Sequence, residues 1–282
     1  MKFSLEINPD NLDADLLTNV AYSLERGEAF QQDYSTAAAL YRIALSMPNG
    51  ERAANNLGWL LLNGLGTKKD IDGAMSLFAD AANRGDSQAM VNLGNIYETG
   101  LVGERPDYKE ALRWYKAAAN AGNMTGMFNY ANMCHHGWGV RRNRKKAYAL
   151  FSFLHEQGVK STAFYMGLYH ECGFVVKRNY QKAREFYLIG AKEGDGHCYN
   201  QLGVLYSKGL GVEKDFTKGI RFYHKAAQLG DTPAITNIGY CYEAGQGVKR
   251  NLKKALTYYQ AAAEQGETMA IEALRRISEI SR

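Results

Sequence analysis

The sequence lacks the features that mark disulfide-rich, disordered or membrane-spanning chains. Its 282 residues include only four prolines and four cysteines. The cysteines form no CxxC pair and recur at no spacing that would join neighbouring helices, so we expect free thiols in a reducing compartment. No run approaches the ~20 apolar residues that span a bilayer. Glu6 interrupts the apolar N-terminal stretch, which is atypical of a signal peptide. These absences predict a soluble, cytoplasmic protein with no membrane partner.

Signatures of catalysis and of nucleic-acid binding are missing as well. The chain has no GxSxG elbow, no HExxH, no P-loop and no GxGxxG after a predicted strand. The net charge of +5 is mild for this length, whereas nucleic-acid binders concentrate positive charge on one face. We therefore expect no enzymatic activity, no catalytic residue and no cofactor, and the composition weighs against nucleic acid as a partner.

What the sequence has instead is an internal repeat of about 36 residues, seen by comparing "NLGNIYETGLVGERPDYKEALRWYKAAANAG" (92–122) with "NIGYCYEAGQGVKRNLKKALTYYQAAAEQG" (237–266). Four kinds of position recur in phase: a terminal glycine, an Asp or Asn fifteen residues before it, an aromatic eight residues after that, and a small residue in the first half. The aromatic positions are Tyr41, Phe78, Tyr115, Phe151, Tyr187, Tyr223 and Tyr259, and the small residues are Ala21, Gly58, Gly94, Ala131, Gly167, Gly203 and Gly239.

Each recurring position has a physical reason in a helix–turn–helix unit. The Asp or Asn accepts from the free N–H groups of the second helix, and the terminal glycine supplies the left-handed residue that ends it. The aromatic predicts one buried face of the second helix, and the small residue allows the first helix to approach it. Because one unit cannot bury its apolar face alone, we expect seven units to stack.

The predicted fold is therefore all-α: a right-handed α-solenoid superhelix of seven helix–turn–helix repeats with a C-terminal capping helix. We expect an extended segment over residues 1–9, the repeats over 10–266 and the cap over 267–282. In the cap, Arg275 stands where the small residue would fall, which predicts a polar outer face.

The pattern resembles the Sel-one-like repeat (SLR) family, a relative of the tetratricopeptide repeat. The resemblance rests on "AMVNLGNIYETG" (89–100), "GHCYNQLGVLYSKGLGVEKD" (196–215) and "KALTYYQAAAEQG" (254–266), and covers roughly residues 15 to 275. It implies a right-handed α-solenoid that acts as an adaptor for protein complexes. Some cysteine-rich secreted relatives are associated with β-lactam binding and hydrolysis, but this chain lacks their regularly paired cysteines.

In a related repeat the first helix lines the concave side of the superhelix, so we expect a partner to bind there. Counting from the small residue, we take positions −6, −3, −2, +1 and +4 to lie on the arc away from the core, and −1 and +3 to face the core. The residues chosen as the partner-binding groove are Tyr22, Asn56, Trp59, Asn92, Asn95, Glu98, Phe128, Asn129, Asn132, Phe164, Glu171, Tyr240 and Glu243.

Two chemistries are available on this predicted face. An asparagine carries both a donor and an acceptor, so a row of them could pair with the backbone of an extended peptide. Aromatic residues such as Trp59, Phe128, Phe164 and Tyr240 could anchor its side chains. The alternative for the asparagines at position −2 is a hydrogen bond to a neighbouring helix or loop of the chain itself.

The stretch "CHHGWGVRRNRKK" (134–146) raises two further possibilities. Cys134 and His170, and likewise His136 and Cys172, occupy equivalent positions in adjacent repeats, so a shared metal site is conceivable. We favour the simpler interpretation of packed side chains and expect no metal. The basic run from Arg141 to Lys146 has basic counterparts in sister loops, which favours a solvated turn.

The function predicted from sequence is a non-enzymatic scaffold that binds an extended segment of a partner protein in its concave groove. Two alternatives stay open: a hydrolase of the β-lactam-binding type, and a nucleic-acid adaptor that uses the basic loop edge. The identity of the partner and the oligomeric state are not encoded in any of these patterns.

Overall fold

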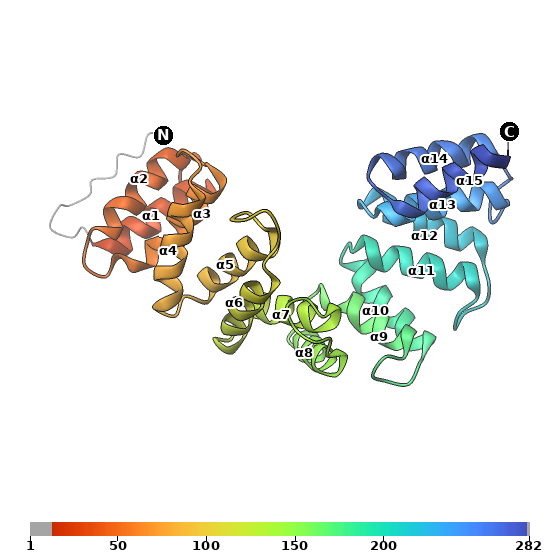
Figure 1. Ribbon diagram of the computed structural model, residues 1–282, viewed down its shortest axis with the longest axis horizontal. Helices are drawn as coiled ribbons and strands as arrows, with labels where there is room; N and C mark the ends of the chain where they lie inside the picture. Colours follow the sequence, from red (N-terminus) through yellow and green to blue (C-terminus); the bar gives the residue numbers. More distant parts are fainter. Residues whose placement is uncertain (1–12, 281–282) are drawn as a thin grey trace. The chain divides into compact units, whose positions relative to one another are not determined.

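A computed structural model describes residues 13–280, and the predicted extended segment over residues 1–9 lies outside them. Within the described range the chain forms α-helices and one 3-10 turn, with no strand, so the prediction of an all-α fold is confirmed (Figure 1). None of these helices combines the length and the apolar character needed to cross a bilayer.

The helices alternate between two roles, which we call helix A and helix B of a repeat. Helix A is α1 (Ala14–Arg26), α3 (Ala53–Asn63), α5 (Ser87–Thr99), α7 (Met124–His136), α9 (Thr162–Cys172), α11 (Gly196–Lys208) and α13 (Thr232–Ala244). Helix B is α2 (Tyr34–Leu45), α4 (Ile71–Asn83), α6 (Tyr108–Asn120), α8 (Arg144–Glu156), α10 (Tyr180–Lys192), α12 (Phe216–Gln228) and α14 (Leu252–Glu264). The last helix, α15 (Thr268–Ile280), packs on α14 through Ala270 and Ile277, and Arg275 is exposed as predicted.

The helices begin and end where the recurring residues predict. Asp70, for example, accepts a hydrogen bond from the N–H of Gly73 at the start of α4, and Asp33, Asp107, Asn179, Asp215 and Asn251 cap five other B helices in the same way. The terminal glycines just past helix B adopt left-handed φ, as in Gly266 at 82°. Each boundary is thus fixed by a residue that satisfies otherwise unpaired backbone groups.

In five repeats the core includes a close approach of a glycine on helix A to the aromatic residue on helix B. All seven aromatic residues are buried. A Cβ placed on Gly239 would lie 2.7 Å from the ring of Tyr259, and one on Gly58 would lie 2.8 Å from the ring of Phe78. These distances are too short for a real contact, so the glycines are required for the ring to fit.

The chain divides into two compact units, residues 1–143 and 144–282, and the boundary falls inside the fourth repeat, between α7 and α8. In the first unit, a short 3-10 helix (Gly50–Arg52) follows Asn49 at a φ of 63°. It occupies the longer connection between the first two repeats, which is where an inserted residue is cheapest.

Candidate partner-binding surface

The candidate surface is the side of the A helices that carries the thirteen predicted groove residues, and we call it the helix-A face. Its exposed aromatic residues are Tyr22 on α1, Trp59 on α3 and Tyr240 on α13, all at position +1. Tyr240 is 52% exposed. Large exposed rings at the same position in several repeats are suited to protein contacts.

The glutamates at position +4 do not point away from helix B, and in this respect the sequence-based orientation is wrong. The carboxylate of Glu171 accepts a hydrogen bond from the Tyr187 hydroxyl at 2.6 Å, and Glu243 accepts from Tyr259 at 2.7 Å. Glu98 lies 2.5 Å from the Tyr115 hydroxyl in the same way. Four residues along a helix turn through only about 40° beyond a full circle, so position +4 sits close to the small residue and above the ring it accommodates.

In six of the seven repeats the residue at +4 follows the chemistry of the helix B aromatic, and the fourth repeat, with His135 at +4 and Phe151 on helix B, departs from this rule. Where helix B supplies a tyrosine, +4 is an acceptor: glutamate in four repeats, with Glu25 accepting from Tyr41 at 2.9 Å, and Ser207 opposite Tyr223 in a fifth. Where helix B supplies Phe78, +4 is Leu62. Burial together with the neighbouring carboxylate raises the pKa of Tyr41, Tyr115, Tyr187 and Tyr259, so these hydroxyls stay protonated donors.

Asparagines at position −2 link neighbouring repeats. The Nδ2 of Asn92 donates to Asn55 Oδ1 at 2.9 Å, and the Nδ2 of Asn237 donates to Asn200 Oδ1 at 2.8 Å. The alternative of a bond to a neighbouring helix is therefore confirmed for these two residues. Each amide keeps part of its hydrogen-bonding capacity, because an Asn side chain has two donor hydrogens and two acceptor lone pairs.

The remaining predicted residues are partly engaged within the chain. Asn95 Oδ1 lies 2.7 Å from the Tyr115 hydroxyl, whose single proton serves either Asn95 or Glu98. Phe164 is half-buried and packs against Tyr165, Tyr187 and His197. Asn56, Phe128, Asn129 and Asn132 are half-buried. Position −3 is less open than expected, because Val91 and Thr236 at that position are buried between helices.

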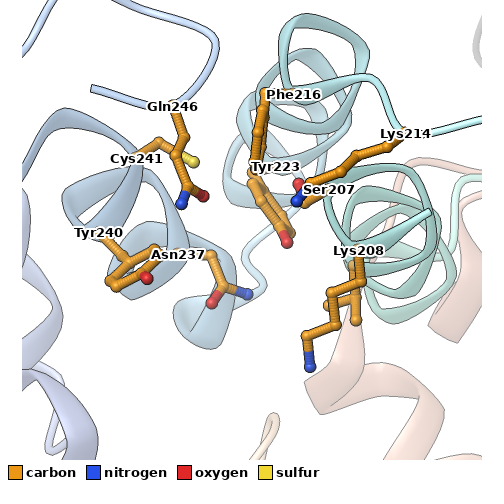
Figure 2. Close-up of a pocket in the computed structure, with 10 residues that line it drawn as sticks. Ser207, Lys208, Lys214, Phe216, Tyr223, Asn237, Tyr240, Cys241 and Gln246 are labelled. Atoms are coloured by element: carbon orange, nitrogen blue, oxygen red, sulfur yellow. The ribbon is translucent and has the colours of Figure 1, made fainter. Parts of the chain in front are cut away.

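Tyr240 stands between two pockets of the second unit. One, of about 430 Å³, is lined by residues of α11, α12 and α13 and their loops. In Figure 2 the side chains of Asn237 and Tyr223 point into this pocket. The other, of about 490 Å³, lies between α13 and α15 and is lined by Thr236, Met269 and Arg276. Asn237 and Tyr240 line both, so these two side chains form the ridge that separates them.

The first unit has a corresponding pocket between α1 and α3. It measures about 380 Å³ and is lined by Thr18, Asn19, Tyr22, Arg52, Asn56 and Asp86. Tyr22 holds position +1 in its repeat, the position that Tyr240 holds in the second unit. The helix-A face therefore presents an exposed tyrosine beside a pocket in each unit.

Sequence reasoning missed the loop residues that complete these pockets. Lys214 and Gln246 line the pocket of Figure 2 but belong to connections that follow helix A, and Phe216, which also lines it, is the first residue of α12. The pattern of helix positions gives no signal for them. The positions of these loop residues relative to the pocket depend on how the neighbouring helices pack, which the sequence pattern does not give.

The structure describes the surroundings of the two candidate features of residues 134–146, the Cys/His cluster and the basic loop. Among the described residues no group of three or more His, Cys, Asp or Glu side chains is placed to hold a metal ion, and none of the four cysteines forms a disulfide. Cys134 and His170 are buried, whereas His136 is exposed and stacks on Trp138 at 4.3 Å between ring centroids. Arg141 and Arg142 are exposed in the loop between α7 and α8.

Comparison with known proteins agrees with the repeat pattern. The model of the Sel1 repeat matches seven times, at residues 14–49, 51–86, 87–123, 125–158, 161–195, 196–231 and 232–267. Among solved structures, a Sel1 repeat protein from Oxalobacter formigenes is 26% identical with a TM-score of 0.78, over 89% of this chain and 97% of that one. A protective antigen of uropathogenic Escherichia coli strains with an SLR fold is 26% identical with a TM-score of 0.71, over 94% of this chain but only 56% of its own length. No curated protein matches the sequence significantly.

Proposed function

This chain belongs to the Sel1 repeat family, whose members are generally protein-interaction scaffolds, and from that premise we propose that it binds an extended segment of a partner protein along the helix-A face. The predicted groove residues are the proposed contact set. Tyr22, Trp59 and Tyr240 are its anchors, and the half-buried asparagines are its polar contacts.

The observation that carries the proposal is the position of Tyr240 between two pockets. An exposed aromatic ridge with a hollow on either side can grip a chain that places successive side chains in the hollows. Neighbouring helices pack about 10 Å apart. An extended peptide covers that distance in about three residues.

The asparagine pairs fit the same mode of binding. The amides of Asn237 and Asn200 are already oriented by their mutual hydrogen bond. Ordering these side chains therefore costs little further entropy when a peptide binds. Their unused donors and acceptors can meet a peptide backbone without selecting its sequence.

A random peptide library displayed on phage tests the proposal. Peptides are selected for binding to the full-length chain. Their Kd values for the wild type and for Tyr240→Ala are then measured by fluorescence anisotropy. Loss of an aromatic anchor costs about 2 kcal/mol or more, so we expect the Kd to rise at least about tenfold.

The matched control is Phe153→Ala, which removes an aromatic side chain that is 46% exposed on helix B of the fourth repeat. This variant should bind the selected peptides as the wild type does. Neutralising Arg141, Arg142 and Arg144 together should also leave binding intact. If the arginine variant loses the peptides while Tyr240→Ala keeps them, the working surface is the loop edge.

A further inference from the structure

A separate pocket in the second unit lies at the corner where α9, the following loop and α10 meet, and we call it the His170 pocket. It measures about 610 Å³ and does not include any residue of the proposed contact set. Its apolar wall is made by Tyr148, Met166, Val176 and Phe186. Its polar wall is made by His170, Lys177, Arg178, Asn179 and Lys182.

The next repeat contains the equivalent pocket, and the comparison isolates what is unusual here. The sister pocket, of about 450 Å³, is lined by Arg184, Tyr206, Val212, Glu213, Lys214, Asp215 and Lys218. A shift of 36 residues places His170 on Tyr206, Lys177 on Glu213 and Asn179 on Asp215. The lining of the His170 pocket therefore has no carboxylate, and Lys177 stands where the sister pocket has Glu213. Arg178 and Lys182 keep the positive charge that Lys214 and Lys218 have in the sister pocket.

In the sister pocket the positive charges have partners close by. The Lys218 ammonium lies 4.2 Å from the centroid of the Tyr206 ring, and its hydrogen bond to the hydroxyl lowers the pKa of that tyrosine. In the His170 pocket the ring has no hydroxyl. Lys177, Arg178 and Lys182 form no ion pair with any residue of the described range.

His170 itself is only 8% exposed, and its ring stacks on Phe186 at 5.4 Å between centroids. Its Nδ1 is buried and, among the described residues, has no hydrogen-bond partner. A buried N–H without a partner is rarer than a lone pair without one, so the proton of the neutral ring belongs on Nε2. The N–H donor of the ring is then Nε2, on a residue that lines the pocket.

We propose that the His170 pocket binds an oxyanion, a carboxylate or a phosphate, carried on an apolar side chain of a protein partner. Lys177, Arg178 and Lys182 supply the positive charge, and Nε2 of His170 supplies a directed donor at the pocket wall. The N-terminal end of α10, where Asn179 already caps the N–H of Lys182, adds a helix dipole that favours an anion. The apolar wall accommodates the group that carries the anion.

The test uses phenyl phosphate, phenylacetate and phenol as probes on the full-length chain, followed through the imidazole resonances of His170 by NMR. Both anions should shift these resonances and bind at least about tenfold more tightly than phenol, because phenol has the ring without the charge. Tighter binding of phenyl phosphate identifies phosphate as the group, and tighter binding of phenylacetate identifies carboxylate.

The sister pocket supplies the control variants. The double change Lys177→Glu/Asn179→Asp gives the His170 pocket the charges of its neighbour and keeps a capping residue on α10. It should fold normally and weaken binding of the anions at least about tenfold. The reciprocal change Glu213→Lys/Asp215→Asn should leave binding at His170 unchanged.

The proposal is overturned if the Lys177→Glu/Asn179→Asp variant binds the anions as the wild type does, or if phenol binds as tightly as they do. Failure of Tyr240→Ala to affect peptide binding would not bear on it, because the two sites share no residue.

Discussion

At the scale of single residues, hydrogen bonds from the helix B tyrosine hydroxyls limit which side chains of the helix-A face are available to bind a partner. A carboxylate that accepts from Tyr115 or Tyr187 is held within its repeat. It can still meet a partner through its second oxygen. The main role of Glu98, Glu171 and Glu243 is therefore to join helix A to helix B within their repeats. Contact with a partner is an additional role.

Removing the hydroxyl of Tyr115 should expose this dependence. Tyr115→Phe leaves the half-buried Glu98 carboxylate short of a donor, and we expect a loss of about 1–3 kcal/mol in the free energy of unfolding. The double change Tyr115→Phe/Glu98→Leu recreates the combination of Phe78 and Leu62 found in the second repeat. It should recover most of that loss, with a coupling of at least about 1 kcal/mol in denaturant unfolding. Additive effects would mean that the pair does not interact.

The close contact of Gly203 with the Tyr223 ring gives a second prediction. A Cβ at Gly203 would overlap that ring, so Gly203→Val should destabilise the protein by about 1–3 kcal/mol through overpacking. Lys208→Val places the same side chain on an exposed position of α11 and should cost only about 0.5 kcal/mol in helix propensity. Equal melting temperatures for the two variants would contradict the packing described for helix A.

Sequence reasoning located the buried residues well and the partly buried ones less well. The small and aromatic positions are dictated by one kind of contact that recurs along the chain, so their periodicity is visible in the sequence. Position +4 combines a solvent-exposed edge with an internal hydrogen bond, and its polar character suggested an open groove. Only the distance between Tyr187 and Glu171 shows where the carboxylate points.

At the scale of helices, one cap also serves the neighbouring repeat. Asp231 accepts from the N–H of Ala234 at the start of α13, and its second oxygen lies 2.6 Å from Nδ1 of His197 on α11. Asp231 is 2% exposed. The Asp231 carboxylate thus connects the start of α13 to α11, because one of its oxygens contacts Ala234 N–H and the other contacts His197.

This link predicts a pH dependence. The hydrogen bond to Asp231 raises the pKa of His197 above its ordinary value. The stability it contributes is complete below the unfolded pKa of about 6.5 and is lost as the pH rises through the higher folded value. Between about pH 6 and about pH 9 the wild type should therefore lose more unfolding free energy than His197→Gln.

The comparison of the two proteins isolates His197. Burial lowers the pKa of His136, His170 and His224, so these residues contribute to the pH dependence of stability with the opposite sign to His197. Their contribution is the same in the wild type and in His197→Gln. Parallel stability curves for the wild type and His197→Gln would contradict a raised pKa of His197 in the folded protein.

At the scale of the whole molecule, the boundary between the two compact units lies in a basic loop. Residues 137–143 connect α7 to α8 and include Arg141 and Arg142. Similar loops within the units carry Lys69, Lys214 and Arg250. Only the first of these loops lies at the boundary between the two compact units, a place where local opening is favoured.

Limited digestion with trypsin should therefore cut first after Arg141 or Arg142 and release two fragments of nearly equal size. Mass spectrometry of the early products identifies the site. The loops at Lys69, Lys214 and Arg250 are internal controls with the same type of residue. Early cleavage at any of them would show that the boundary is no weaker than the connections inside a unit.

The seven repeats and their order were predictable because each repeats the same capping and packing rules, and the family match agrees with them. The division at residue 143 was not predictable. The fourth repeat keeps its cap position Asn143, its small residue Ala131 and its aromatic Phe151. Nothing in that pattern distinguishes a boundary from an ordinary connection.

The hydrogen bonds described above also bear on how such a chain can grow by duplication. The tyrosine and its glutamate lie in the same repeat, so a copied segment of about 36 residues arrives with its internal acceptor already present. The bond between Asn92 and Asn55 instead crosses a joint between repeats. An inserted copy must find that partner in its new neighbour. The joints, and not the repeats, are therefore where a lengthened chain has to adapt its sequence.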